Sequence, residues 1–373
     1  MENPVSKAKG AVDRRSFMKT GLAAGGAATI GGGFLASAIE ARADRDDRGR
    51  RLSAGDAAIL RFLAAAELIE SDLWVQYAEL GGLTSGQPIE VDHNQTLNAY
   101  QTALSNLDGD GPQYITSNML DEQSHASFLN AYLESRGAEP VNFKPFTTLA
   151  GSTATGSSGK KRLTNLMHLN VDTSWYTRYR SAKNPDMGAT FPQAITLNNV
   201  TAIPITDADF NNADHIQVIA NTAAFHFGYI EQGGSSLYAI MSQKVTDPEV
   251  LMITLGIGAD EVAHFLEWVD FAGNGVQDPV APVTDPVTKL TFPNFFDPLN
   301  PAIQPSLIFP VPCEFISPSL PKVAIIRPLT DRFGGAVATI ESFTADGLFD
   351  GQSRQFLQTL SVLAVEADSA FRR

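Results

Sequence analysis

Two four-residue stretches decide the fold, Glu122-Gln123-Ser124-His125 and Glu261-Val262-Ala263-His264. The first lies in a helical run over residues 113–135, and the second in a run over residues 248–272 that opens on Asp247-Pro248. Residues three apart on an α-helix differ by about 300° of rotation and about 4.5 Å of rise. The Glu and the His of each stretch therefore point the same way, and each helix presents one carboxylate and one imidazole together.

Two further helical runs each carry a single glutamate among apolar residues. Residues 53–80 contain Glu67 within Ala-Ala-Ala-Glu-Leu-Ile, and residues 207–244 contain Glu231 among aromatic and small residues. A charge in such a setting is costly unless a partner neutralises it. Along the chain the helices read Glu, Glu-x-x-His, Glu, Glu-x-x-His. This order predicts an all-α fold, a four-helix bundle with its polar groups directed inward.

The inward groups have the chemistry of metal ligands. Four carboxylates converging in a dry core would mostly take up protons, whereas two divalent cations would cancel their charge. Hard oxygen ligands combined with imidazole suit Fe(II), Mn(II) and, less well, Zn(II), so the residue types do not separate iron from manganese. The predicted metal ligands are Glu67, Glu122, His125, Glu231, Glu261 and His264.

Two acidic positions offer alternatives to this ligand set. Glu70 lies one turn after Glu67 and is the alternative first-helix ligand, although a solvated place at the flank of the bundle is the favoured interpretation. A third Glu-x-x-His match, Glu90-Val91-Asp92-His93, falls in a turn-rich segment and is interpreted as accidental. One such match is a weak signal, but two on separate long helices, each paired with a core Glu, are a strong one.

The remaining histidines and the single cysteine are assigned no ligand role. His226 precedes Glu231 by five residues, about 140° around the helix, so it is expected to face elsewhere. His168 and His215 stand alone and are expected to be hydrogen-bonded or exposed. Cys313 is the only cysteine, which excludes an intrachain disulfide and a thiolate cluster.

The N-terminus has the features of an export signal. Asp13-Arg14-Arg15-Ser16-Phe17-Met18-Lys19 precedes a Gly/Ala-rich apolar stretch over residues 21–38, and Ala41-Arg42-Ala43 offers small residues for cleavage. The stretch is too short and glycine-rich to predict a membrane span, and none is expected in the mature chain. Residues 1–43 are predicted to be a twin-arginine signal read by the Tat export machinery, which places the protein in the periplasm or otherwise outside the cytoplasm. Residues 44–52 form a charged, flexible neck.

The charge of the chain bears on its partners. The formal net charge is −14 at pH 7, with 41 acidic and 27 basic residues. An acidic body repels nucleic acid and anionic lipid surfaces, so neither is an expected partner.

The rest of the chain surrounds the bundle, which is predicted over residues 53–273 with Ser53 as its first N-cap. Residues 141–205 are a long crossover between the second and third helices. Residues 274–373 are predicted to be a Pro/Phe-rich, partly irregular extension, without clear periodicity before residue 350. Shorter elements are predicted at residues 95–107 (helix), 163–180 (short helices), 323–326 (strand) and 353–372 (helix).

Several stretches resemble one known family. Residues 64–77, Glu231-Gln232-Gly233-Gly234-Ser235-Ser236-Leu237-Tyr238 and Glu261–His264 followed by Phe265 are similar to the first, third and fourth helices of the ferritin-like superfamily. The closest likeness is to the branch that includes plant desiccation-related proteins and exported bacterial homologues. The resemblance covers roughly residues 55–273. One departure is Trp74, where relatives usually carry Tyr.

The resemblance implies specific roles for the six ligands. Glu122 and Glu261 would each bridge two metal ions. Glu67 and Glu231 would be terminal ligands, and the two motif histidines would cap one metal each. The cofactor implied is two iron or two manganese ions, and the co-reactant is O₂ or peroxide.

Two functions are compatible with this reading. One is a di-metal oxidoreductase that acts in oxidative or desiccation stress. The other is a non-enzymatic envelope or stress protein whose bundle uses the metal structurally or has lost it. A storage cage is disfavoured because the crossover and the extension would obstruct close packing of subunits. The sequence leaves the oligomeric state open.

Overall fold

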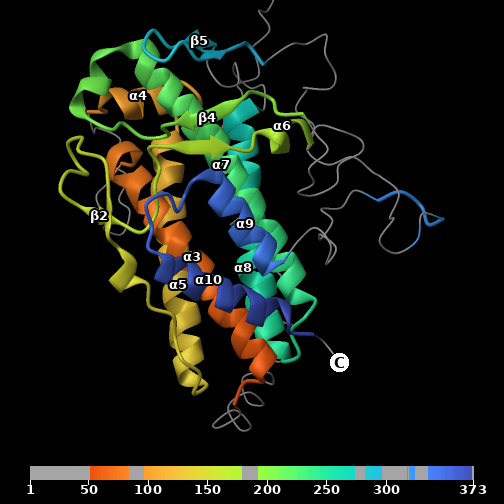
Figure 1. Cartoon of the computed structure of the whole chain (residues 1–373). Coiled ribbons are helices and arrows are strands. Elements are labelled where there is room, and N and C mark those ends of the chain that lie inside the picture. The colour runs from red at the N-terminus through yellow and green to blue at the C-terminus, as the bar shows by residue number, and fades with distance from the viewer. Residues whose placement is uncertain are drawn as a thin grey trace, which may run out of the picture. The chain divides into compact units, whose positions relative to one another are not determined.

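The computed structural model describes most of the chain after residue 50, and that part is mainly helical (Figure 1). The signal over residues 1–43, the Glu90–His93 motif and Cys313 lie outside the described residues. Among the described residues, none of the helices combines the length and the apolar character needed to cross a membrane. The structure describes residues 51–83, 96–178, 192–273, 282–295, 317, 319–323 and 335–371.

Four long helices form the centre of the described fold. They pack chiefly in two pairs, α3 against α5 and α7 against α8, with a thinner contact between α5 and α8. The predicted predominance of helices is therefore confirmed, and each of the four long helical runs is present. Their bounds are Ala54–Gly81 for α3, Gly111–Ser135 for α5, Ala213–Ser242 for α7 and Pro248–Gly273 for α8.

The helix ends follow local capping chemistry. Ser53 accepts a hydrogen bond from the Asp56 amide at 3.0 Å, as an N-cap does, and α8 begins at Pro248 as predicted. The prediction of one helix over residues 207–244 was wrong at its start. A 3-10 helix, η3 (Asp207–Asn211), comes first, and α7 begins only after Asn212, whose extended backbone and side chain cap the next turn.

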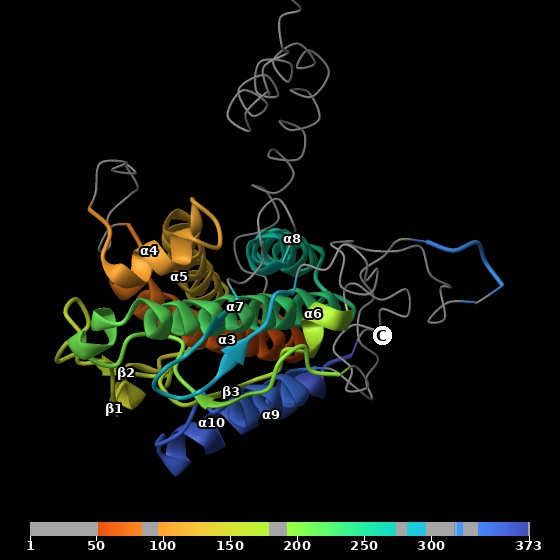
Figure 2. The ribbon, with the colours of Figure 1, turned by 90° about the horizontal axis from the view of Figure 1, so that it is seen from above.

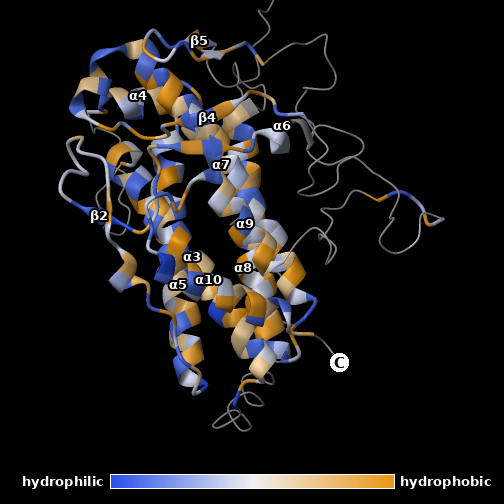
Figure 3. Ribbon diagram, viewed as in Figure 1, coloured by the Kyte–Doolittle hydropathy of each residue, from blue (hydrophilic) through white to orange (hydrophobic). Residues whose placement is uncertain are grey.

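An aromatic core joins the two helix pairs. Trp74 of α3 stacks on Phe227 of α7 and Trp268 of α8, with ring centroids 5.0 and 5.4 Å apart. All three rings are fully buried, and hydrophobic positions line the long helices along their length (Figure 3). Such buried aromatic contacts contribute about 0.5–1.5 kcal/mol per pair beyond the area they bury. They hold three helices in register beside the polar groups.

Short elements decorate the helices. The strands pair antiparallel as β1 with β2, β3 with β4, and β5 with β6. The prediction of short helices within residues 163–180 is matched in the described part by α6, which β3 precedes. Val323 forms a single bridge, and the rest of the predicted strand lies outside the described residues. The bounds are α4 Ala99–Ser105, β1 Leu149–Ala150, β2 Lys161–Arg162, β3 Leu169–Val171, α6 Ser174–Arg178, β4 Leu197–Val200, β5 Val283–Thr284 and β6 Thr291–Phe292.

Two C-terminal helices cover one side of the long helices. α10 (Arg354–Asp368) matches a predicted helix, but α9 (Ala336–Asp346) falls where no periodicity was expected. The N-terminus of α9 is capped from a distance, because the Asp368 carboxylate accepts the amides of Ala336 and Val337. Figure 2 shows α9 and α10 on one side of α3 and α7, with α5 and α8 on the other.

Candidate metal centre

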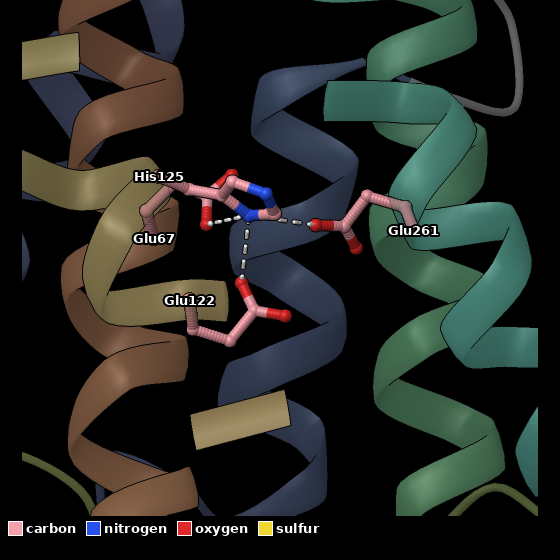
Figure 4. Close-up of side chains that lie close together, drawn as sticks. All are labelled: Glu67, Glu122, His125 and Glu261. Atoms are coloured by element: carbon pink, nitrogen blue, oxygen red, sulfur yellow. Dashed lines mark hydrogen bonds and ion pairs between the residues drawn. The ribbon is translucent and has the colours of Figure 1, made fainter. Parts of the chain in front are cut away.

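The centre of the four long helices holds a cluster of acidic and imidazole groups. In its first half, Glu67 of α3, Glu122 and His125 of α5, and Glu261 of α8 each direct one ligand atom to a common point (Figure 4). These atoms lie within 4.8 Å of one another, and all four residues are buried. Such a group can hold a metal ion.

A second half lies beside the first and shares two of its residues. Glu122 and Glu261 join Glu231 of α7 and His264 of α8, again with ligand atoms within 4.8 Å and all four residues buried. The structure therefore brings together all six residues that the sequence singled out. The two shared carboxylates lie between the two histidines.

Both imidazoles direct the same nitrogen inward. His125 Nδ1 lies 3.4 Å from an oxygen of Glu67, 3.4 Å from one of Glu122 and 3.8 Å from one of Glu261. His264 Nδ1 lies 3.1 Å from Glu122 Oε1 and 3.3 Å from Glu231 Oε2. Each Nδ1 is thus placed to share a cation with the carboxylates around it.

Several carboxylate oxygens of the cluster have no hydrogen-bond partner in the described part of the chain. Four glutamates present buried oxygens that make no hydrogen bond within the described residues, and both oxygens of Glu261 are among them. An unpartnered buried oxygen is costly, and a charged one far more so. Divalent cations would satisfy these oxygens at once, so the donor set fits a metal centre. The oxygens are Glu67 Oε2, Glu122 Oε1, Glu231 Oε2, Glu261 Oε1 and Glu261 Oε2.

Two aspartates that sequence reasoning missed hold the outer nitrogens of the imidazoles. Asp260 of α8 lies 3.2 Å from His125 Nε2, and Asp121 of α5 lies 3.3 Å from His264 Nε2. Each contact crosses from one helix to the other. A carboxylate on Nε2 fixes the ring and leaves Nδ1 free to bind a cation. The signal was present, because both motifs read Asp-Glu-x-x-His.

Neutral side chains anchor the two lone glutamates. Trp74 Nε1 donates to Glu231 Oε1 at 2.9 Å, and the Tyr238 hydroxyl donates to Glu67 Oε1. In both cases the other oxygen, Oε2, is the one without a hydrogen-bond partner. Each terminal carboxylate is therefore held by one oxygen while the other faces the cluster.

A glycine makes room for one of the shared carboxylates. A Cβ atom at Gly234 of α7 would overlap Glu261 Oε2, whereas a Cβ at the adjacent Gly233 would meet nothing within 4 Å. The absence of a side chain at Gly234 lets the Glu261 carboxylate lie against the α7 backbone.

Glu70 corrects one sequence prediction. It was expected at a solvated flank, yet its side chain is buried, with 3% of its surface exposed. It belongs to neither ligand group among the described residues, so Glu67 is the α3 residue that lies in the cluster. Burial, and then the charges of Glu122 and Glu67, raise the pKa of Glu70 well above its usual value. Because other helices pack against α3 on several sides, the Glu70 side chain does not reach solvent.

The cluster binds protons strongly when it carries no cation. Burial and then the charge of Glu122 raise the pKa of Glu67 to about 8. Burial also raises the pKa of Glu261 well above its usual value, with Glu122 and other carboxylates adding to it. Burial alone would lower the pKa of His125, but the neighbouring carboxylates of Asp260, Glu122 and Glu67 outweigh it and raise that pKa to about 12. The site therefore has an excess of negative charge that protons or cations must balance.

The three other histidines that the structure describes lie outside the cluster, as expected. His226 is buried and contacts Tyr77 and Asp346. His215 lies between Asp209 and Asp285, and His168 contacts Asn199 at the surface.

Comparison of the chain with known protein families, with curated proteins and with solved structures found no match. The case for a function therefore depends on the residues and geometry of the cluster itself.

Proposed function

We propose that this chain is an exported ferritin-like protein whose four long helices bind two divalent cations, iron or manganese, and that the loaded centre reacts with O₂ or peroxide. The observation that carries the proposal is the convergence of four glutamates and two histidines, with buried oxygens that lack hydrogen-bond partners. The order of these residues along four helices is that of ferritin-like di-metal proteins.

The geometry supports a two-metal rather than a one-metal site. Glu122 and Glu261 belong to both ligand groups, which suits bridging carboxylates. Glu67 groups only with His125, and Glu231 only with His264, which suits terminal ligands and one imidazole for each cation. Two divalent cations bring four positive charges, which match four ionised glutamates.

The residues of the chain would divide the work of such a site. When bound, two redox-active cations supply electrons to an oxidant. Glu122 and Glu261 would each contribute to both cations, and Asp121 and Asp260 keep Nδ1 of each histidine aimed inward. The buried Trp74 orients Glu231 through its indole N–H. The outer nitrogens of the histidines lie near the partly exposed Asp121 and Asp260, so the α5–α8 side is where a small oxidant and protons would enter.

A purely structural metal is the second candidate. One observation favours it: the ligands come from both helix pairs, so cations would tie α3 and α5 to α7 and α8 whether or not any reaction follows. In that case metal binding raises the free energy of unfolding without turnover.

Metal analysis tests the proposal. We expect protein loaded anaerobically with Fe(II) or Mn(II) to hold two ions per chain, and Glu122→Ala and Glu261→Ala to lose most of them. Glu134→Ala, an exposed position on α5, is the matched control and should load normally. Wild-type protein that binds less than one ion per chain would contradict the proposal.

Oxygen uptake by the loaded protein separates the two candidates. An oxidoreductase consumes O₂ or peroxide in step with oxidation of its metal, and the Ala variants stay folded but lose this reaction. A structural site shows no such consumption, and the same variants lower the melting temperature instead.

A further inference from the structure

Three buried groups outside the ligand set form a chain of hydrogen bonds. The hydroxyl of Tyr77 on α3 lies 2.6 Å from Nδ1 of His226 on α7, and His226 Nε2 lies 3.0 Å from Asp346 Oδ2 at the end of α9. The exposed fractions are 0% for Tyr77, 0% for His226 and 2% for Asp346. The three side chains are thus shielded from bulk solvent, and the metal site as described above does not use them.

The positions of the protons follow from the partners available. Among the described residues, the Tyr77 hydroxyl has His226 as its only hydrogen-bond acceptor, so it donates to Nδ1. With Nδ1 accepting from Tyr77, it is the Nε2–H of His226 that donates to Asp346. Burial raises the pKa of Asp346 and the imidazole opposes that rise, so the Asp346 carboxylate is favoured most when His226 is positively charged.

An aromatic contact links this chain to the metal centre. The Tyr77 ring centroid lies 5.6 Å from that of Trp74, and Phe227 packs edge-on against Tyr77 at 4.6 Å. Trp74 in turn donates its indole proton to Glu231. Trp74 and Tyr77 are two oxidisable rings in contact. Through them, the proposed ligand Glu231 is connected to the His226 base.

Because Tyr77 is buried, its oxidation depends on a neighbouring group that can accept its proton. It raises the pKa of Tyr77 well above its usual value, so the side chain remains a neutral phenol. A buried phenol that lost only an electron would leave an unbalanced positive charge, which a dry interior disfavours strongly. Loss of the electron is favoured only if the proton moves to a neighbouring base, and His226 is that base.

We propose that Tyr77 is a redox-active residue that passes one electron through Trp74 to the metal centre while its proton moves to His226. The Tyr77 O–H bond breaks, an N–H bond forms at His226 Nδ1, and the electron leaves through Trp74. A metal centre held by the six ligands and oxidised by O₂ or peroxide would be the one-electron acceptor. Tyr77 becomes a neutral tyrosyl radical, and the imidazolium pairs with the Asp346 carboxylate. This inference rests on the proposed metal centre.

Two other buried tyrosines lack such a base. The Tyr100 hydroxyl donates to the Ala202 backbone carbonyl at 2.6 Å, which does not take up a proton. The Tyr238 hydroxyl donates to Glu67, a proposed ligand whose basicity a bound cation would lower. Tyr77 is therefore assigned as the residue that donates the electron, and Tyr100 and Tyr238 serve as controls.

The first test uses the metal-free full chain and so does not depend on the proposed function. A photo-oxidised ruthenium tris-bipyridine complex serves as the external one-electron oxidant, and electron paramagnetic resonance detects tyrosyl radicals. We expect Tyr77→Phe to lose most of the signal and Tyr100→Phe to retain it. His226→Gln, which keeps a hydrogen-bond acceptor but no base, should lose it as well while its circular dichroism shows an intact fold. A signal that survives in Tyr77→Phe or in His226→Gln overturns the assignment.

The second test asks whether Tyr77 is coupled to the metal. Protein loaded with Fe(II) is mixed with O₂ or peroxide and frozen during the reaction. We expect a tyrosyl signal that is lost in Tyr77→Phe and retained in Tyr238→Phe. If the metal binds and is oxidised but no Tyr77-dependent signal forms, the coupling is refuted. If no metal binds, the proposed function fails, and the first test still decides whether Tyr77 and His226 act together.

Discussion

Metal binding at the cluster should release protons, because the ligands that must bind as free bases are protonated in the metal-free protein. His125, with a pKa of about 12, and His264, whose pKa is also raised, each hold a proton at pH 7. Glu67, with a pKa of about 8, holds a third. Burial also raises the pKa of Glu261, which favours its protonated form. Cations bind carboxylates and neutral imidazoles only, so these protons leave on loading.

The magnitude follows from the number of protons displaced. Each proton released changes the apparent affinity about tenfold per pH unit, or about 1.4 kcal/mol. Release of about three protons for two cations corresponds to about 4 kcal/mol per pH unit for the pair. The sign is definite: protons compete with cations, so binding strengthens as pH rises towards 8 and weakens as pH falls. Above about pH 8 the slope decreases, because Glu67 has then lost its proton in the metal-free protein as well.

Isothermal titration calorimetry in two buffers with different ionisation enthalpies counts the protons directly. Mn(II) is the better titrant, since it avoids oxidation during the measurement. We expect Glu134→Ala to release the same number of protons as the wild type, because Glu134 is exposed and belongs to neither ligand group. Binding of two ions with less than one proton released would refute the electrostatic argument. It would mean either that the cluster is unprotonated when empty or that the metal binds elsewhere.

Three further predictions concern side chains around the ligands. Gly234→Ala should displace a shared carboxylate and lower metal content, whereas Gly233→Ala, which meets open space, should load normally in the same elemental analysis. Glu67→Gln should lose metal while Glu70→Gln retains it, and equal loss from both would show that the α3 ligand is misassigned. Asp260→Asn should weaken metal affinity by about 10–100-fold, as loss of a carboxylate behind a histidine ligand does. Unchanged affinity by calorimetry would argue against its positioning role.

The sequence predicted the long helices well because their signals are local. The N-cap at Ser53 and the proline at the start of α8 act within one turn of the residues they affect. The start of α7 was placed too early because η3 and α7 have similar composition, and only the cap at Asn212 divides them. α9 was missed because its cap, Asp368, lies far along the chain, and no local pattern reports a contact of that kind.

Part of the candidate site was also predictable from local sequence signals. A carboxylate and an imidazole three residues apart share a helix face wherever that helix packs, so the two motifs could be read without the fold. The burial of Glu70 depended on how many helices surround α3, and the partners of Asp121 and Asp260 lie on another helix. Asp346 is the last residue of α9, a helix that the sequence did not predict, so its contact with His226 could not be predicted either.

The pairing of the helices explains how a charged centre and a stable fold coexist. α3 packs mainly against α5 and α7 mainly against α8, and each pair contributes two glutamates and one histidine. Without cations the carboxylates of the two pairs repel one another across the seam, and protons on the histidines and glutamates relieve only part of that repulsion. Cations held by Glu122 of one pair and Glu261 of the other would replace this repulsion with attraction. Because the same two residues would join the pairs and bridge the metals, loss of metal should loosen the α5–α8 contact before the aromatic core that joins α3, α7 and α8.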